Sequence, residues 1–165
     1  MTAQSAGPLS RWIAVGNLPP EGIDVTVEAS PEERQALAAE FNLVAIHSLT
    51  GSFRVSGSLR RVEVSGGIEA EIDQVCVVTL EPFTAQVREH VEVAYAAPGT
   101  AAPDDQDPPD EIVNGQVDLG ALTAEFLALG LDPYPRKPGA GFAYEPADSK
   151  AETPFAALAK LKRDK

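Results

Sequence analysis

The sequence predicts an α+β domain in which an antiparallel, twisted β-meander or a partial barrel packs against two main helices. Three observations lead to this class: a capped helix start near residue 30, alternating apolar and polar residues from 43 to 95, and a second amphipathic helix after residue 118. A chain of 165 residues, 44% of them hydrophobic, is long enough for one domain with a substantial core.

The predicted organisation is one folded unit with flexible N- and C-terminal extensions. We expect residues 1–10 to be disordered and residues 11–135 to form a single α+β domain, which includes a mobile acidic loop at 97–115. Residues 136–165 are predicted to be a tail that ends in a short basic amphipathic helix.

Two short strands are predicted before the first helix. The stretch "RWIAV" (residues 11–15) is apolar enough for a strand with Trp12 as an anchor. Two prolines and a glycine in "NLPPEG" (17–22) interrupt the ladder and indicate a turn. Apolar residues then alternate with polar ones in "IDVTVEA" (23–29), which is typical of a half-buried strand.

The stretch "SPEERQALAAEFNL" has the clearest helix start in the chain. Ser30 can accept hydrogen bonds from the free amides of the first turn, Pro31 suits the first helical position, and Glu33 completes a capping box. Leu37 and Phe41 lie one turn apart and are predicted to share the buried face.

From residue 43 to residue 95 the period is close to two. The segments "LVAIHSLTGSFRVSG", "SLRRVEVSG", "GIEAEIDQVCVV" and "FTAQVREHVEVAY" are predicted to be consecutive strands. Gly51, Gly57 and the pair Gly66 and Gly67 are interpreted as breaks or turns between them. Such a run favours an antiparallel meander or a partial barrel.

A second helix is predicted over "DLGALTAEFLALGLDPYP" (residues 118–135). Asp118 caps its N-terminus and Pro133 ends it. Its apolar stripe is predicted to consist of Leu119, Leu122, Phe126 and Leu129.

The charge of the chain restricts what its surface can bind. The net charge is −12, so binding of nucleic acid over the whole surface is excluded, because phosphate binding depends on positive charge. The segment 98–116 holds five acids and no base, whereas residues 134–165 hold seven bases and four acids. An acidic body with a mildly basic tail can present two different surfaces to partners.

The chain is predicted to be cytoplasmic. Its N-terminus has no basic region followed by an apolar one, and no apolar run approaches the roughly 20 residues that a membrane span requires. The single cysteine cannot form an internal disulfide, which agrees with a reducing compartment.

Cys76, in the run "DQVCVVTLEPF", could be a metal ligand, a nucleophile or a buried core residue. His47 and His90 lie on separate predicted strands with no ligand-like spacing to it, so no metal and no cofactor are predicted. A nucleophile would need a positioned base and a lowered pKa. The valines on both sides favour an inert thiol, packed in the core at the end of a strand.

No motif indicates an enzyme. The chain lacks a G-x-S-x-G elbow and a phosphate-binding glycine loop followed by lysine and serine or threonine. Its carboxylates lie mostly in the acidic loop or on predicted solvent faces, and paired catalytic acids need opposed environments that a sequence does not reveal. We therefore predict a protein without catalytic residues and without a small-molecule substrate.

Two groups of basic residues are candidate contacts. Arg54, Arg60 and Arg61 could form a basic patch, although alternation with acidic residues favours a solvated face. The terminal "KLKRDK" could contact RNA phosphate or an acidic partner, or it could only add solubility.

Three segments together carry a family resemblance: "QVCVVTLEPF" (74–83), "DLGALTAEFLALGLDPYPRKPGA" (118–140) and "PFAALAKLK" (154–162). In this order and spacing they resemble the YceD family, the large ribosomal RNA subunit accumulation proteins. The resemblance extends from about residue 12 to the C-terminus. The acidic insertion and the valines around Cys76 resemble the alphaproteobacterial branch of this family.

The resemblance implies a non-enzymatic bacterial role in accumulation or processing of 23S rRNA, and so in large ribosomal subunit biogenesis. The implied partner is rRNA, a pre-ribosomal large subunit or a basic ribosomal protein, with no membrane contact. Many members have a C-x-x-C at the first segment, which would suggest zinc or redox chemistry. Here the second position is Thr79, a poor zinc ligand, so no metal is predicted.

A physical hypothesis for binding follows from the segments that flank the β-rich body. Tyrosine and arginine are residue types that stack on or grip RNA and protein partners. The terminal helix can dock through apolar residues while it presents its bases. The predicted binding residues are Tyr134, Arg136, Lys137, Phe155, Lys160, Lys162 and Arg163.

Two classes of function remain open at this point. The first is an assembly factor that contacts rRNA or a pre-ribosomal particle through its basic C-terminal elements. The second is an acidic adaptor or holding protein that binds a basic ribosomal protein and makes no RNA contact.

Overall fold

The computed structural model describes residues 7–100 and 108–143. The elements, in chain order, are β1 (Trp12–Ala14), β2 (Ile23–Glu28), α1 (Pro31–Glu40), β3 (Ala45–Ser58), β4 (Arg61–Val75), β5 (Pro82–Ala96), β6 (Asp110–Glu111), β7 (Gln116–Asp118) and α2 (Leu119–Gly130). The predicted α+β class is confirmed.

In the described part of the chain the strands form two sheets. The larger sheet has five strands in the order β2-β3-β4-β5-β6, and the smaller one pairs β1 with β7. Every pairing is antiparallel except the short parallel one between β5 and β6. The β2–β5 part is thus the predicted meander, and the sheet is open.

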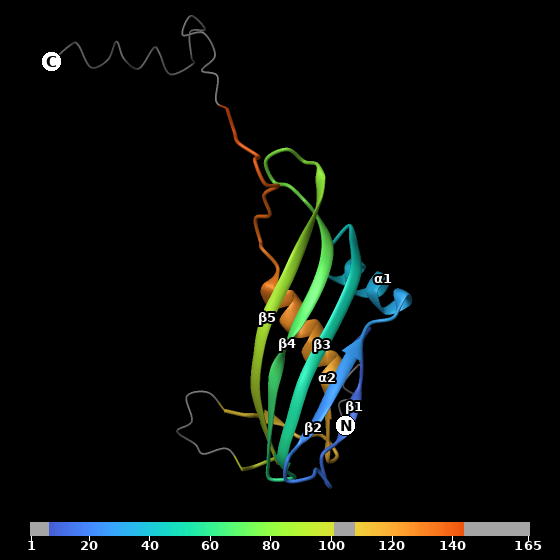
Figure 1. Cartoon of the computed structure of the whole chain (residues 1–165), viewed down its shortest axis with the longest axis vertical. Coiled ribbons are helices and arrows are strands. Elements are labelled where there is room, and N and C mark those ends of the chain that lie inside the picture. Colours follow the sequence, from blue (N-terminus) through green and yellow to red (C-terminus); the bar gives the residue numbers. More distant parts are fainter. Residues whose placement is uncertain (1–6, 101–107, 144–165) are drawn as a thin grey trace, which may run out of the picture.

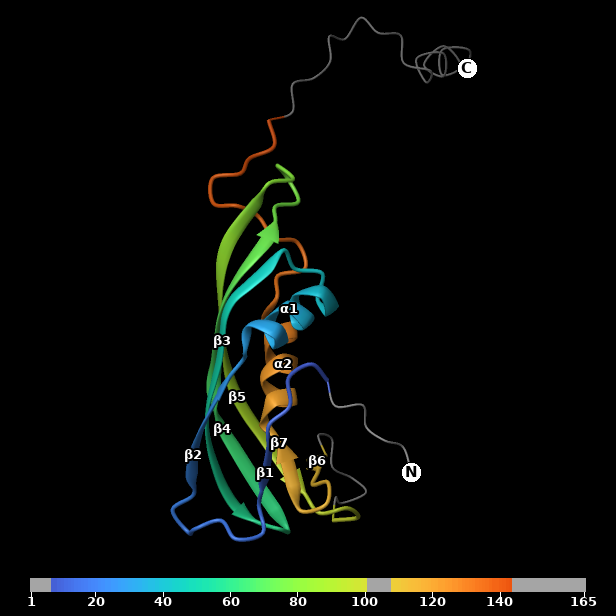
Figure 2. The same cartoon turned by 90° about the vertical axis from the view of Figure 1, so that its right-hand side faces the viewer.

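The molecule is elongated because β3, β4 and β5 are long and run along its long axis (Figure 1). Figure 2 shows both helices and the small sheet on the same face of the large sheet. The other face carries no described element. One face of the large sheet therefore forms the core, and the other is exposed to solvent.

The first helix begins as predicted. The Ser30 hydroxyl accepts from the Glu33 amide, and the Glu33 carboxylate accepts from the Ser30 amide at 2.8 Å, which completes the capping box. Leu37 is fully buried, and Phe41 packs against the core from the C-cap position. Both residues of the predicted pair therefore contribute to the interface with the sheet.

The glycines of the long strands do not break them. The predicted strands 58–66 and 67–78 are joined in a single strand, β4, and the glycines that were interpreted as breaks lie inside β3 or β4. Gly51 shows one reason. A Cβ at this position would lie 2.5 Å from the Phe53 ring and 2.7 Å from the Thr123 hydroxyl, so glycine allows α2 to pass close to the sheet.

The phase of the second helix differs in part from the prediction. Leu119, Leu122 and Phe126 face the core, but Leu129 is 69% exposed, and Leu127 is fully buried instead. The helix also ends earlier than predicted, at Gly130. An apolar stripe assigned from residue spacing alone leaves the rotation of the helix about its axis uncertain by part of a turn. Packing against the sheet determines that Leu127, and not Leu129, is buried.

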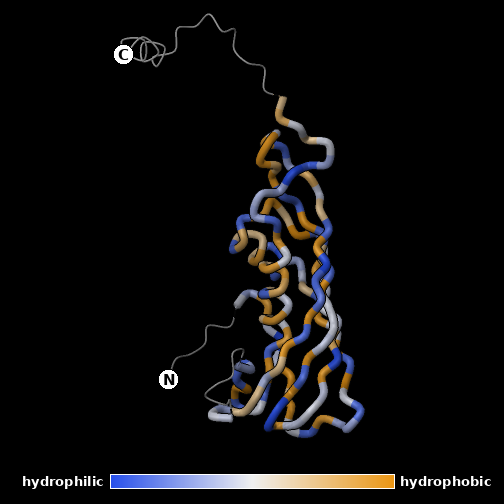
Figure 3. Tube along the Cα trace, turned by 90° about the vertical axis from the view of Figure 1, so that its left-hand side faces the viewer, coloured by the Kyte–Doolittle hydropathy of each residue, from blue (hydrophilic) through white to orange (hydrophobic). Residues whose placement is uncertain are grey.

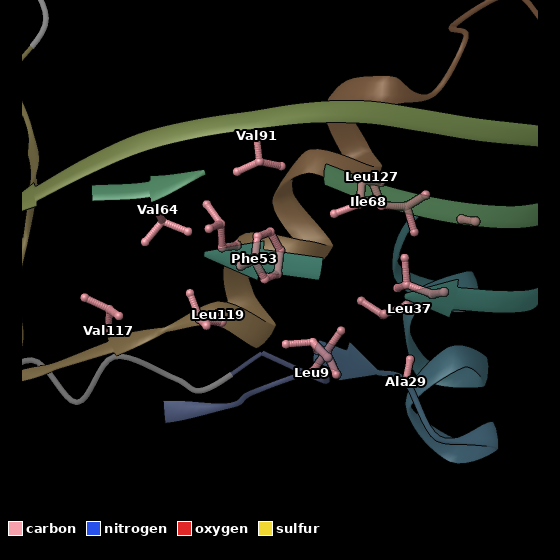
Figure 4. Packing of buried hydrophobic residues seen from close by; sticks show 14 of the residues in the cluster. Leu9, Ala29, Leu37, Phe53, Val64, Ile68, Val91, Val117, Leu119 and Leu127 are labelled. Atoms are coloured by element: carbon pink, nitrogen blue, oxygen red, sulfur yellow. The ribbon is translucent and has the colours of Figure 1, made fainter. Parts of the chain in front are cut away.

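The core combines side chains from nearly every described element. Leu9, Leu37, Phe53, Ile68, Val91, Leu119 and Leu127 converge between the large sheet and the helices (Figure 4). Orange and blue alternate along the strands in Figure 3, as expected where one face of a sheet is buried and the other is wet. Burial of this apolar surface is the main stabilising term of the fold.

The segments around the predicted boundaries are partly ordered. Leu9, within the segment 1–10 that was expected to be disordered, is fully buried. In the expected acidic loop, Ile112 is also buried, and its amide donates to the carbonyl of Ala96. Residues 101–107, which hold most of the loop's acids, lie outside the described residues.

Asp118 is the N-cap of α2, as predicted, and it also holds the N-terminal segment. Its carboxylate accepts from the Ser10 hydroxyl and the Arg11 amide, both at 2.7 Å, and from the amides of Gly120 and Ala121 at 3.0 and 3.1 Å. One side chain therefore joins the start of the chain to the start of the second helix.

We expect Asp118→Ala to lower the free energy of unfolding by about 2 kcal/mol, because a helix cap and two further hydrogen bonds are lost together. Asp118→Asn is the matched control, since its amide oxygen can keep part of the cap, and its loss should be smaller. Denaturant titration of both variants measures the difference. Losses close to zero in both variants would contradict the stabilising role of the Asp118 hydrogen bonds.

Candidate functional site

The turn between β4 and β5 forms the narrow end of the molecule. Two hydrogen bonds close residues 76–81: the Cys76 amide donates to the Glu81 carbonyl, and the Leu80 amide donates to the Cys76 carbonyl, both at 2.9 Å. Leu80 has φ +59°, a left-handed conformation that a leucine rarely adopts, and its side chain is 77% exposed. An exposed leucine in a strained conformation marks this turn as a candidate for function.

The segment after α2, residues 132–137, crosses this turn and is called the strap below. The Val77 amide donates to the Pro135 carbonyl at 2.9 Å, and the Lys137 amide donates to Cys76 Sγ at 3.3 Å. On the surface, Lys137 Nζ lies 3.1 Å from a Glu81 carboxylate oxygen. Backbone bonds therefore fix the strap, so its side chains project from a defined frame.

Cys76 is the link between turn and strap. The residue is inaccessible to solvent and follows the last residue of β4, as predicted, but it lies at the thin end of the molecule and outside the main core cluster. A hydrogen bond from the Thr79 side chain, with further ones from the backbone amides of Lys137 and Thr79, lowers the pKa of the thiol from 9.0 to about 7. Burial opposes this effect but is the weaker influence.

The lowered pKa of Cys76 predicts a pH dependence of stability. The folded protein binds this proton less tightly than the unfolded chain, so the stabilisation is complete above the thiol's ordinary pKa of 9.0 and is lost as the pH falls through about 7. Relative to Cys76→Ser, which does not titrate here, the wild type should gain free energy of unfolding from pH 7 to pH 9. Denaturant titration across this range measures it, and a constant difference would contradict the assignment.

Apolar side chains gather at this end of the molecule without a described covering. The exposed residues of the turn and of the segment after α2 are called the tip surface. They are four apolar residues and one arginine: Val77, Leu80, Tyr134, Phe142 and Arg136. Tyr134 is 71% and Phe142 81% exposed, and Val77 is 45% exposed. After the strap, the described chain extends beyond the β4–β5 turn at this end of the molecule (Figures 1 and 2). Large apolar groups in water next to a fixed frame are typical of interaction sites.

The structure brings together part of the predicted binding set. Tyr134 and Arg136 are exposed on the strap, whereas the Lys137 ammonium is paired with Glu81. Phe155, Lys160, Lys162 and Arg163 lie outside the described residues. The predicted binding residues do not include Val77 and Leu80. The sequence "EP" after Leu80 indicates a turn, but the exposure of Leu80 and its positive φ depend on the backbone path of that turn.

Of the other basic candidates, Arg54 and Arg61 lie on the large sheet in ion pairs, and Arg60 lies in the turn between β3 and β4. Arg54 lies 2.9 Å from an Asp24 oxygen, and Arg61 lies 3.5 Å from a Glu63 oxygen. His47 lies 2.9 Å from Asp73. These contacts agree with the solvated-face interpretation of the arginines. The described residues contain no group of three or more His, Cys, Asp or Glu side chains that could hold a metal ion.

The tip surface lies within a region of recognised sequence similarity. Residues 64–162 match the family described as large ribosomal RNA subunit accumulation protein YceD, and the match covers more than half of the chain. The chain belongs to the YceD family. The turn, α2 and the strap lie inside the matched region, as do Phe155, Lys160 and Lys162, whereas Arg163 lies one residue beyond it. No curated protein and no solved structure matches the chain.

Membership in the YceD family confirms the resemblance and supports a role in large-subunit rRNA accumulation. The match does not distinguish branches, so the alphaproteobacterial assignment stays a prediction. At the position where the resemblance implies a second cysteine in many YceD proteins, the Thr79 amide donates to Cys76 Sγ at 3.5 Å. The cysteine here thus joins two segments through hydrogen bonds from protein groups.

Proposed function

We propose that this YceD-family protein promotes accumulation of the large-subunit rRNA by binding 23S rRNA, or a pre-ribosomal particle that contains it, through the tip surface and the basic C-terminal segment. The observation that carries the proposal is the strap, which exposes Tyr134 and Arg136 and is hydrogen-bonded to the turn that holds the exposed Leu80. The proposed action is binding without catalysis.

The residue types of the tip surface suit single-stranded or looped RNA. Unpaired bases stack on aromatic rings and on guanidinium planes, and each stacked base contributes about 1–3 kcal/mol. Tyr134 and Phe142 provide exposed rings, and Arg136 provides a cation between them in sequence. Because the strap is fixed by backbone hydrogen bonds, little conformational entropy is lost when these groups bind.

Charge supports the same end of the molecule. The solvent face of the large sheet carries many carboxylates, among them Glu63, Glu69 and Glu71, and repels phosphate. The segment 155–165 follows the strap in the sequence, and its basic residues would add the phosphate contacts that a surface with one exposed arginine lacks.

Removal of the tip side chains should weaken RNA binding while the fold stays intact. We expect Tyr134→Ala with Arg136→Ala to raise the Kd for 23S rRNA fragments by roughly tenfold or more, because one stacking contact and one cation are lost. Deletion of residues 155–165 should weaken binding further and reduce its salt dependence. Electrophoretic shift at two salt concentrations measures both effects.

Arg54→Ala is the matched control, because this arginine is exposed on the sheet face and pairs with Asp24. The Arg54→Ala protein should bind RNA with the affinity of the wild type. If it and the Tyr134→Ala, Arg136→Ala protein bind equally well, the tip surface is not the RNA contact. If no variant and no wild-type protein binds 23S rRNA or pre-ribosomal particles, the proposed function is wrong.

The alternative, an acidic holding protein for a basic ribosomal protein, depended on the acids at 104–111. Three of the five acids of that segment lie outside the described residues, and the family description concerns ribosomal RNA.

Cytoplasmic location and the absence of catalysis stay predictions. In the part of the chain that the structure describes, no helix is long and apolar enough to cross a membrane.

A further inference from the structure

The outer edge of β5 is the longest strand edge that the described elements leave unpaired. β5 pairs with β4 over its whole length without a bulge, but β6 covers only Tyr95 and Ala96. Residues 83–94 contain no proline, so every backbone donor is present. An open, regular edge of this length is a template for one more strand, and natural proteins usually cover or interrupt such edges.

A groove of about 640 Å³ follows the C-terminal half of this edge. Its lining includes both Glu92 and Val93, and adjacent residues of a strand point to opposite faces of the sheet, so the groove reaches around the edge of β5. From α2, Phe126 and the 69% exposed Leu129 contribute an apolar wall. Side chains of an added strand would therefore meet an apolar surface on the helix side.

The charges of the groove select the kind of strand. Glu63, Glu92, Asp110 and Glu125 line it. Among the described residues of the lining, Arg61 is the one base, and it is paired with Glu63 at 3.5 Å. Carboxylates around an apolar wall favour a segment in which basic and apolar side chains alternate. RNA and other acidic ligands are repelled here.

We propose that the outer edge of β5 binds an extended, basic polypeptide segment of a partner protein as an additional β-strand. Main-chain hydrogen bonds to residues 83–94 supply the affinity, and alternate apolar side chains enter the groove beside Phe126 and Leu129. A second copy of this chain is a poor occupant, because its net charge is −12 and two such bodies repel each other. The inference does not depend on RNA binding at the tip surface.

The probe is a labelled synthetic peptide of about twelve residues in which lysine and valine alternate, the pattern of a strand with one basic and one apolar face. Fluorescence anisotropy should show saturable binding to the full chain, and hydrogen exchange should slow at residues 83–94. The same peptide with alternate N-methylated amides keeps its charge but cannot form the ladder, and it should not protect these amides. Equal binding by both peptides would overturn the proposal in favour of unspecific charge attraction.

Variants locate the contact on the chain. Glu92→Gln with Glu125→Gln should weaken the peptide roughly five- to tenfold, and Glu21→Gln with Glu40→Gln, an equal charge change at exposed sites outside the groove, should weaken it less than twofold. Equal losses would overturn the proposal. A dimer of the free chain in which residues 83–94 are already protected would also overturn it. Tighter peptide binding after Lys160→Glu with Lys162→Glu would overturn it as well, because the chain's own tail would then be the occupant.

Discussion

Gly66→Ala is expected to lower the free energy of unfolding by about 3 kcal/mol or more, a large effect for the addition of one methyl group. Gly66 has φ +156° in the middle of β4, and a Cβ there would collide with the Ser52 carbonyl of the neighbouring strand. Backbone atoms of a central ladder cannot move aside, so β3 and β4 would have to separate locally.

Gly141→Ala is the control for this prediction, because a Cβ at Gly141 has no neighbour within 4 Å. Its unfolding free energy should match that of the wild type within about 0.5 kcal/mol. Denaturant titration, with the m-value compared between the proteins, measures both. A Gly66→Ala protein as stable as Gly141→Ala would show that β4 is not one continuous strand.

Leu127→Ala is expected to cost about 2–5 kcal/mol of unfolding free energy, because it leaves a cavity in the core between α2 and the large sheet. Leu127 is fully buried there. Leu129→Ala removes the same atoms from the same helix, but that side chain is 69% exposed, and the cost should stay within about 0.5 kcal/mol.

The pair tests the rotational phase of α2, since helix propensity changes equally in both variants. Thermal or denaturant unfolding of the two proteins gives the comparison. A larger loss for Leu129→Ala than for Leu127→Ala would mean that the helix packs with the stripe drawn from the sequence. The exposed Leu129 beside the β5 edge would then be unavailable to a partner.

Most of the fold could be predicted from local patterns. The capping box at Ser30, the cap at Asp118 and the period-two segments identify both helices and the antiparallel meander without reference to distant residues. These features involve groups within a few positions of each other, so the sequence contains their cause directly.

The errors concern features that depend on tertiary contacts. A glycine in a strand can mark either a turn or a close approach of another chain segment. At Gly51 the reason is a close approach, which becomes visible only from the position of Thr123 on α2. Leu127 and Leu129 are chemically identical, and the phase of α2 against the sheet determines which one is buried.

The candidate site could be predicted only in part for the same reason. Tyr134 and Arg136 were selected by residue type, but the hydrogen bonds that hold the strap to the turn join positions about sixty residues apart, such as Lys137 and Cys76. Cys76 matters here through its position between the two segments.

Contact between the tip surface and 23S rRNA can be tested by site-specific photocrosslinking. A photoreactive phenylalanine analogue replaces Tyr134 in the full chain, and in a control it replaces the exposed Glu40 at the end of α1. After irradiation of cells, we expect a 23S rRNA adduct from position 134 and none from position 40. Equal adducts from both positions, or no RNA adduct from position 134, would contradict it.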